Sequence, residues 1–335
     1  MQKISTQVFF LLNIVLFIFL LFLIWLSLFT FSAFPIKITD TLNIFSIVNN
    51  EMHIVDQIML NIRLPRAIVA AICGAALGAS GAVMQAITNN PLSSPSILGI
   101  NSGAALGMAC ASTFVPWIGV YGISTAALLG GAIVWVIVMI IGKSWQFGND
   151  NIRLVLAGVA MSALCAALTK AIIILEEDQA TGIIVWLAGS FTDSSWSDVI
   201  YLLPPTLLCI FCIILISPKL NLLQLGDEYA ISLGVSPKKY KIIGSILVLI
   251  MVSAVISTIG SLGFVGLLIP HMARFIIGTD HRKFIPLAMI LGACLVLLAD
   301  VISRAIIFPM ETPAGAILAL IGAPFFIYLV RKNYD

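Results

Sequence analysis

Long apolar runs separated by short polar stretches dominate this chain, and most runs have the length of a membrane-spanning helix. A transmembrane α-helix needs about 20 predominantly apolar residues. The first run, at 8–34, is longer than the roughly 7–15-residue core of a signal peptide, and no small-residue cleavage site follows it. The pattern predicts ten spans, at 8–34, 63–87, 96–114, 123–142, 152–175, 199–216, 241–259, 264–277, 284–308 and 313–330.

Three of the segments between these spans have a recognisable character. The stretch 38–61 is moderately polar and predicts a loop with a short surface helix. The segment 182–189 is apolar but below spanning length, which predicts a half-helix or a lid. The turn at 88–96 contains Pro91 and Pro95 among Asn and Ser residues, a pattern that ends one helix and starts the next.

Composition indicates that lipid, rather than water, surrounds most of the chain. Hydrophobic residues make up 61% of it, charged residues only 10%, and the mean hydropathy is +1.13. Average soluble domains carry about 25% charged residues, and a soluble protein of this size needs a polar shell to face water. A soluble enzyme and a nucleic-acid-binding protein are therefore excluded. We expect one all-α, multi-pass membrane domain over residues 1–335.

Lysine and arginine positions predict the orientation, because cytoplasmic loops carry an excess of both. With the N-terminus inside and ten alternating spans, twelve of the 17 fall on the inner side and both termini are cytoplasmic. The outer side keeps Lys37, Arg63, Arg66 and Arg304, and Lys170 lies in the outer half of the fifth span.

Residue types that carry enzymatic chemistry are not arranged for it in this sequence. The six cysteines lie inside apolar runs, where Cys behaves as a small hydrophobe, and the three histidines lack zinc-site spacing. The tripeptide at 142–144 resembles the end of a P-loop, but the glycine required five residues before Gly142 is Ile137. We expect no catalytic, metal or cofactor site in this chain.

Charged residues deep inside the spans are scarce, although such residues usually mark ion-coupling sites. Lys170 and Asp300 are the candidates, and both lie nearer the outer end than the middle. Lys170 can extend toward Glu176 or Glu177. Asp300 can pair with Arg304, four residues later on the same helix. We therefore expect the energy for any transport to come from another subunit.

Small residues line one face of the second span. Gly74 and Gly78 form a G-x-x-x-G motif, and Gly81 follows on the same helix. Between helices in lipid there is little hydrophobic driving force, so close backbone approach through small residues supplies the packing. We expect these three glycines to pack helices within a compact many-helix body.

The inner segment 225–241, between the sixth and seventh spans, is a candidate partner site. Its acidic start at Asp227 and Glu228 suits a helix N-terminus, and Gly234 is a stop signal. Ser236 and Pro237 then form a cap-and-first-turn pair. The pattern predicts two short helices at the inner face. Either they dock a cytoplasmic partner, or the segment is a solvated loop with orienting lysines.

Three outer arginines form a second candidate site. Arg63 and Arg66 lie three residues apart at the start of the second span, and Arg304 lies near the end of the ninth. If the bundle brings them together, they form a cationic ring suited to the carboxylates of an incoming protein, because arginine presents a bidentate fork. The alternative is interfacial anchoring together with the Asp300–Arg304 pair.

Several segments, in their order and spacing, resemble the permeases of iron–siderophore and cobalamin ABC importers. The resemblance covers the chain from Arg63 to Arg331. It departs from the family pattern after the fifth span, where a glycine-rich stretch is reduced to AGSFT at 188–192, so no gate residues carry over. The matching segments are RLPR (63–66), GAALGASGAVMQA (74–86), NPLSSPSILG (90–99), LGDE (225–228), SLGV (232–235), GFVGLLIPHMAR (263–274), GTDHR (278–282), ADVISR (299–304) and PAGAILALIGAPFF (313–326).

The resemblance implies a ten-helix, cobalamin-permease-like bundle in the bacterial inner (plasma) membrane, paired with an identical or homologous permease. It implies an external binding protein that delivers a ferric siderophore and docks through glutamates on the residues matching Arg63, Arg66 and Arg304. Haem or cobalamin is the alternative cargo, and an ion-coupled carrier or a membrane scaffold the alternative function. It also implies a cytoplasmic ATPase dimer, holding the ATP and magnesium, that attaches through Leu225, Gly226, Asp227, Glu228, Leu233, Gly234, Ser236 and Pro237.

Overall fold

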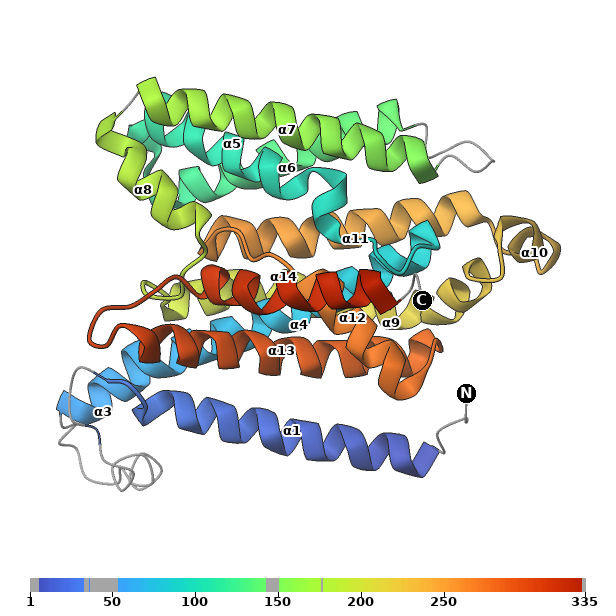
Figure 1. Cartoon of the computed structure of the whole chain (residues 1–335), viewed down its shortest axis with the longest axis horizontal. Helices are drawn as coiled ribbons and strands as arrows, with labels where there is room; N and C mark the ends of the chain where they lie inside the picture. Colours follow the sequence, from blue (N-terminus) through green and yellow to red (C-terminus); the bar gives the residue numbers. More distant parts are fainter. Residues whose placement is uncertain (1–5, 33–35, 37–53, 143–150, 176, 333–335) are drawn as a thin grey trace.

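In the described part of the chain, ten helices of 13 to 28 residues correspond one to one to the ten predicted spans (Figure 1). The computed structural model describes residues 6–32, 36, 54–142, 151–175 and 177–332, and the regular elements within these ranges are all helical. The all-α membrane fold is thus confirmed. The ten helices are α1 (Thr6–Phe29), α4 (Leu64–Thr88), α5 (Ile100–Phe114), α6 (Gly119–Ile141), α7 (Asn151–Leu175), α9 (Trp196–Leu223), α11 (Pro237–Ile259), α12 (Val265–Ile277), α13 (His281–Ile306) and α14 (Ala314–Lys332).

Within the described ranges, seven helices are long and apolar enough to cross a membrane, while α5, α12 and α14 are shorter. Proline and left-handed backbone account for two of the short helices. A 3-10 turn, η3 (Pro95–Leu98), precedes α5, and α5 itself has only 15 residues. Phe264, whose φ is +65°, precedes the 13-residue α12 and interrupts the helical path from α11.

The remaining described elements are short and lie at the two ends of the bundle. At the outer end, α3 (Ile54–Ile58) and the π-turn η2 (Met59–Arg63) run without a break into α4, and η4 (Pro116–Ile118) joins α5 to α6. Helix α8 (Glu177–Leu187) overlaps the predicted half-helix at 182–187, begins five residues earlier and ends two residues before the predicted end. At the inner end, α10 (Asp227–Ser232) lies between α9 and α11.

The arrangement in space places the predicted inner and outer segments at opposite ends of the bundle. The start of α1 and the end of α14 lie at the same end of the bundle as α10, whereas α3 and α8 lie at the opposite end (Figure 1). The first span is shorter than predicted, because α1 ends at Phe29 and the chain turns at Phe31, whose φ is +49°. The rest of the predicted outer loop, 37–53, lies outside the described residues.

Helix α4 is the core of the bundle, and most of its side chains are buried among α9, α11, α12 and α13. Small residues allow this central position. Gly74 lies against Gly292, and Gly78 against Ala288, both on α13. A Cβ at Gly81 would lie 2.6 Å from the carbonyl carbon of Gly266 on α12, so only glycine fits there without moving a backbone. The structure therefore places the three predicted packing glycines at helix crossings.

Candidate functional site at the two ends of the bundle

The three predicted arginines converge at the outer end of the bundle from two helices. Arg63 ends the η2 turn, and Arg66 directly follows Pro65 in the first turn of α4. Arg304 lies in the last turn of α13, one turn after Asp300. Asp300 is fully buried and stands between Arg66 and Arg304, so it links the outer ends of α4 and α13.

Arg66 divides its fork between two carboxylates. Its Nε and Nη2 donate to Oδ1 of Asp300 at 2.9 and 2.8 Å. Its Nη1 donates to both oxygens of Glu311, in the loop between α13 and α14, at 2.9 and 2.8 Å. Such charge-assisted, multiply bonded pairs are stronger than neutral hydrogen bonds. Arg66 therefore ties α4 to α13 and to the loop that precedes α14.

Arg304 and Arg63 bind the outer end of α1. Nη1 of Arg304 donates to the carbonyl oxygens of Ser27 and Thr30, both at 3.1 Å, and its Nη2 donates to Oγ of Ser27 at 2.8 Å. Nη2 of Arg63 donates to the carbonyl oxygen of Phe31 at 3.2 Å. The last carbonyls of a helix have no intrahelical partner and carry partial negative charge. The two guanidinium groups therefore complete the end of α1.

The outer arginines are together as expected, but they form a buried, paired cluster rather than an exposed ring. Arg63, Arg66 and Arg304 are 7%, 4% and 1% exposed. A buried guanidinium requires partners, and the two carboxylates and the end of α1 provide most of them. The predicted Asp300–Arg304 pair is confirmed, with Nη2 of Arg304 lying 3.2 Å from Oδ2 of Asp300.

Glu311 is the functional candidate that sequence reasoning missed, since its place in a short outer loop carried no signal. About a quarter of its side chain (26%) is exposed, in contrast to the buried Asp300. Oε2 of Glu311 also accepts from Oγ1 of Thr192, after α8, at 2.8 Å. Partial burial acts to raise the pKa of the Glu311 carboxyl, but the charge and hydrogen bonds of Arg66 and the Thr192 hydroxyl outweigh it and lower that pKa.

Glycines also explain how the end of α8 reaches this region. Gly189 and Gly260 have φ of +71° and +80°, and a Cβ on either would collide with the other segment's backbone. The amide of Gly315, at the start of α14, donates to the carbonyl oxygen of Gly189 at 3.0 Å. The amide of Ser190 donates to the carbonyl oxygen of Ile259 at 3.1 Å. The segment after α8 is thus bonded to both α11 and α14.

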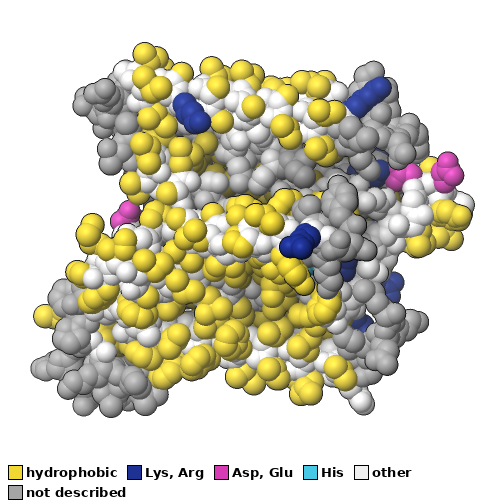
Figure 2. Space-filling view, in the orientation of Figure 1, with side chains coloured by type: hydrophobic (Ala, Val, Ile, Leu, Met, Phe, Trp, Pro, Cys, Tyr) yellow, Lys and Arg dark blue, Asp and Glu magenta, His cyan; other side chains and the backbone are white. Residues whose placement is uncertain are grey.

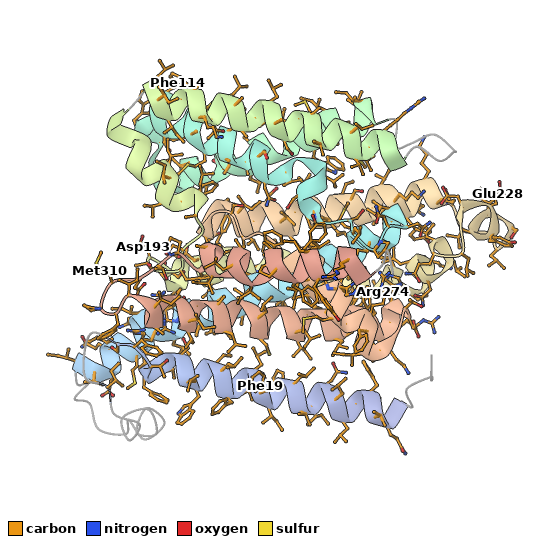
Figure 3. All side chains as sticks on the ribbon, viewed as in Figure 1. Phe19, Phe114, Asp193, Glu228, Arg274 and Met310 are labelled. Atoms are coloured by element: carbon orange, nitrogen blue, oxygen red, sulfur yellow. The ribbon has the colours of Figure 1, made fainter. Side chains whose placement is uncertain are left out.

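A cavity of about 570 Å³ opens beside the same segment. Its walls come from α5, α8, the 190–198 stretch and the end of α11, and they combine apolar side chains with hydroxyls and the carboxylates of Asp193 and Asp198. Asp193 lies at the same end of the bundle as Met310, while Glu228 lies at the other (Figure 3). Asp198 is partly engaged, since its Oδ2 accepts from the amide of Ser195 at 2.8 Å.

At the inner end, the 225–241 segment contains one short helix where two were predicted. Gly226, with φ of +104°, precedes α10, and Gly234, with φ of +76°, follows it. Pro237 begins the long helix α11 itself, because a proline at the first turn leaves the rest of the hydrogen-bond ladder intact. Ser236 occupies the cap position, but its side chain makes no capping bond. Nζ of Lys241 bonds Oδ2 of Asp227 at 2.7 Å.

This inner segment protrudes from the bundle and presents apolar side chains (Figures 1 and 2). Leu225 and Leu233, both predicted, are 58% exposed, and Tyr229 is 68% exposed. Ile231 is exposed as well, whereas Ala230 and Val235 are buried beneath the segment. Exposed apolar patches with polar surroundings mark interaction sites. Tyr229 and Ile231 were missed, although apolar residues in a polar loop were a usable signal.

No group of three or more potential metal ligands occurs among the described residues. Of the two candidate ion-coupling residues, Asp300 is bound to two arginines. Lys170 is exposed on α7, and Glu176, one of its two predicted partners, lies outside the described residues. The carboxylate of Asp300 is therefore already paired and is not available to bind a coupling ion.

Comparisons with known proteins agree with this geometry. The Fe(3+) dicitrate transport system permease protein FecC of Escherichia coli is 44% identical over 94% of this chain and 95% of its own length. The hemin transport system permease protein HmuU of Yersinia pestis is 39% identical over 83% and 84%. A solved inward-facing metal-chelate type ABC transporter superposes with a TM-score of 0.83 at 31% identity, over 97% of this chain and 99% of that one. The FecCD transport family model matches residues 19–332. Because this model covers most of the chain and the relatives match it along most of their length, the chain belongs to the FecCD transport family.

Proposed function

We propose that this chain is the permease subunit of an ATP-driven importer whose cargo is a ferric siderophore of the citrate type. The observation that carries the proposal is the family match over residues 19–332, together with 44% identity to a ferric dicitrate permease along nearly the whole of both chains. As a multi-pass permease of the bacterial inner membrane, the chain is itself non-catalytic. ATP and magnesium are held by the partner ATPases, and no cofactor is held here.

The exposed patch on the inner segment supports an ATPase partner. Tyr229 and Ile231 lie on the protruding helix α10 and Leu233 directly follows it, while the buried Ala230 and Val235 anchor this segment to the bundle. Movement of α10 is passed on to the bundle only if α10 is rigidly attached to it. The ion pair between Lys241 and Asp227 provides such an attachment, because it joins α10 to the start of α11. A cytoplasmic ATPase dimer that grips the patch would move α9 and α11 together.

The outer cluster supports docking of an external binding protein through carboxylates. Arg66 is the arginine through which docking acts, because its Nη1 faces the partly exposed Glu311. Arg63 carries an Nη1 with no hydrogen-bond partner. Arg304 is bound on several sides, so we assign it the supporting role of holding Asp300 and α1. The proposal of a second permease subunit, identical or homologous, rests on the family relationship.

The alternative of an ion-coupled carrier is disfavoured by the state of Asp300. A coupling carboxylate must bind and release an ion or a proton during transport. Asp300 is fully buried and committed to two arginines, so it has no room for that cycle.

Transport by the reconstituted complex tests the function. The chain is assembled in proteoliposomes with its partner permease and ATPases, and uptake of ⁵⁵Fe-citrate is followed with the binding protein outside and ATP inside. We expect uptake that requires ATP and the binding protein. Uptake of ferrichrome, haemin or cobalamin in preference to ferric citrate would overturn the cargo assignment. Uptake by the chain alone under a proton or sodium gradient would overturn the importer assignment.

A further inference from the structure

The fork of Arg66 has one fixed and one exchangeable partner. Asp300 is fully buried and receives two hydrogen bonds on the Nε edge. Glu311 is partly exposed, sits on a short loop and receives two bonds from Nη1. An incoming carboxylate could reach Arg66 only from the side that Glu311 occupies. Glu311 therefore stands where the anion of a docking protein would bind.

Two hydrogen bonds, one of them made by Glu311, connect the segment after α8 with the segment before α14. Thr192 Oγ1 donates to Glu311 at 2.8 Å, and four residues after Glu311 the amide of Gly315 donates to the carbonyl oxygen of Gly189 at 3.0 Å. Oγ of Ser190 lies 2.8 Å from Oγ1 of Thr192. The two segments thus lie side by side and are joined by a side-chain bond and a backbone bond.

We propose that Glu311 is an internal stand-in for the docking carboxylate: a carboxylate of the binding protein displaces it from Arg66, and this displacement releases the Thr192 segment. We call Arg66, Glu311 and Thr192 the Glu311 bridge. The inference rests on the proposed function, since it requires a carboxylate-bearing external partner.

Exchange is favoured at Glu311 for a physical reason. Removing Asp300 from Arg66 would leave buried charges unpaired, which is strongly unfavourable. Glu311, by contrast, can turn toward water while the incoming carboxylate takes over the same two bonds. One charge-assisted pair replaces another at Arg66, so the net work of exchange is small. The Thr192 hydroxyl, however, loses its acceptor, and the contact between the two segments is reduced to its backbone bond.

The first measurement is the affinity of the binding protein for the permease–ATPase complex in nanodiscs. In Glu311→Gln, the competing charge is gone while the side-chain shape remains, so we expect binding about three- to tenfold tighter than in the wild type. Asp193→Asn is the matched control, because it removes one negative charge from the same face without contacting Arg66. It reports the general electrostatic effect of a less negative surface. Thermal unfolding of each variant verifies that it is folded.

The second measurement is amide hydrogen exchange on the same complex. In the wild-type complex, docking of the binding protein should speed amide exchange in peptides covering 188–195 and 311–318. In Glu311→Gln or Thr192→Val, part of that increase should be present before the binding protein is added. Peptides within α4 should not change. Affinity in Glu311→Gln that equals or falls below that of Asp193→Asn would overturn the exchange. Unchanged exchange at 188–195 on docking would overturn the release. If the wild-type complex binds no external protein at all, the proposed function has failed instead.

Discussion

Replacing Asp300 with asparagine tests whether one buried carboxylate holds the outer end of the bundle together. The change keeps the side-chain volume and one carbonyl acceptor but removes the negative charge between Arg66 and Arg304. In the wild type, Oδ1 of Asp300 accepts from Arg66 at 2.9 and 2.8 Å, and Oδ2 lies 3.2 Å from Arg304 without hydrogen-bond alignment. Asparagine also places an NH2 group beside guanidinium donors.

The size of the effect follows from these contacts. A hydrogen bond to a charged group contributes about 1.5–3 kcal/mol, so the two bonds from Arg66 set an upper bound of about 3–6 kcal/mol. Removing one partner of a buried ion pair costs about 3–5 kcal/mol. Arg66 keeps Glu311, and Arg304 keeps the carbonyls of α1. We therefore expect a loss of about 3 kcal/mol in the free energy of unfolding, at the lower end of that range.

Chemical unfolding in mixed detergent micelles, followed by tryptophan fluorescence, measures this quantity. Asp193→Asn is the control, because that carboxylate is exposed, and it should change the free energy by no more than about 0.5 kcal/mol. A loss of less than about 1 kcal/mol in Asp300→Asn would contradict this expectation. The two arginines would then be held by the helix ends and Glu311 alone.

Three further outcomes follow from other parts of the structure. Gly81→Ala should destabilise the fold by about 1–3 kcal/mol in the same unfolding assay, because the new Cβ meets the backbone of α12. The control Gly182→Ala places a Cβ where no atom lies within 4 Å, so it should be neutral or stabilising. Equal effects of the two substitutions would contradict the role of Gly81 in packing. The double substitution Tyr229→Glu and Leu233→Glu should weaken ATPase co-purification at least about tenfold, because charges replace exposed apolar contact surface, while the permease still reaches the membrane. Undiminished co-purification would exclude this patch as the ATPase-binding surface. Since the pKa of Glu311 is lowered in the fold, its stabilising pair is complete at neutral pH and is lost only as pH falls below the ordinary glutamate pKa of about 4.3. The stability difference between wild type and Glu311→Gln should thus be constant down to about pH 5, and a difference that shrinks above that pH would contradict it.

Much of the fold could be predicted from local pattern alone. A helix in lipid satisfies its own backbone, so an apolar run of sufficient length is enough to predict a span. The errors lie where backbone conformation departs from that pattern. Phe31 adopts a positive φ just after α1 ends at Phe29, whereas the apolar run predicts a span that continues to residue 34. Pro237 begins α11 directly, so the second short inner helix does not exist.

The candidate sites were predictable in kind but not in environment. Arg63, Arg66 and Arg304 were recognisable as outer cations from their sequence positions. Arg66 is paired with Asp300 and Glu311, 234 and 245 positions away, and Arg304 bonds the carbonyl of Ser27, 277 positions away. Only the local Asp300–Arg304 pair could be predicted from the sequence. On the inner segment, Tyr229 and Ile231 stand out in the sequence as apolar residues in a polar loop, but only the burial of Ala230 and Val235 shows which side of the segment faces the bundle.

The sequence by itself determined the solvent, the number of spans and the family, because each depends on composition, local hydrophobicity and the order of short motifs along the chain. The tertiary structure alone decided which charges are paired. Arg66 and Glu311 are separated by 245 positions and meet because α4 crosses α13 through Gly74 and Gly78. Pairing depends on distance in space, and in a bundle that distance is set by the close approach of helices far apart in sequence.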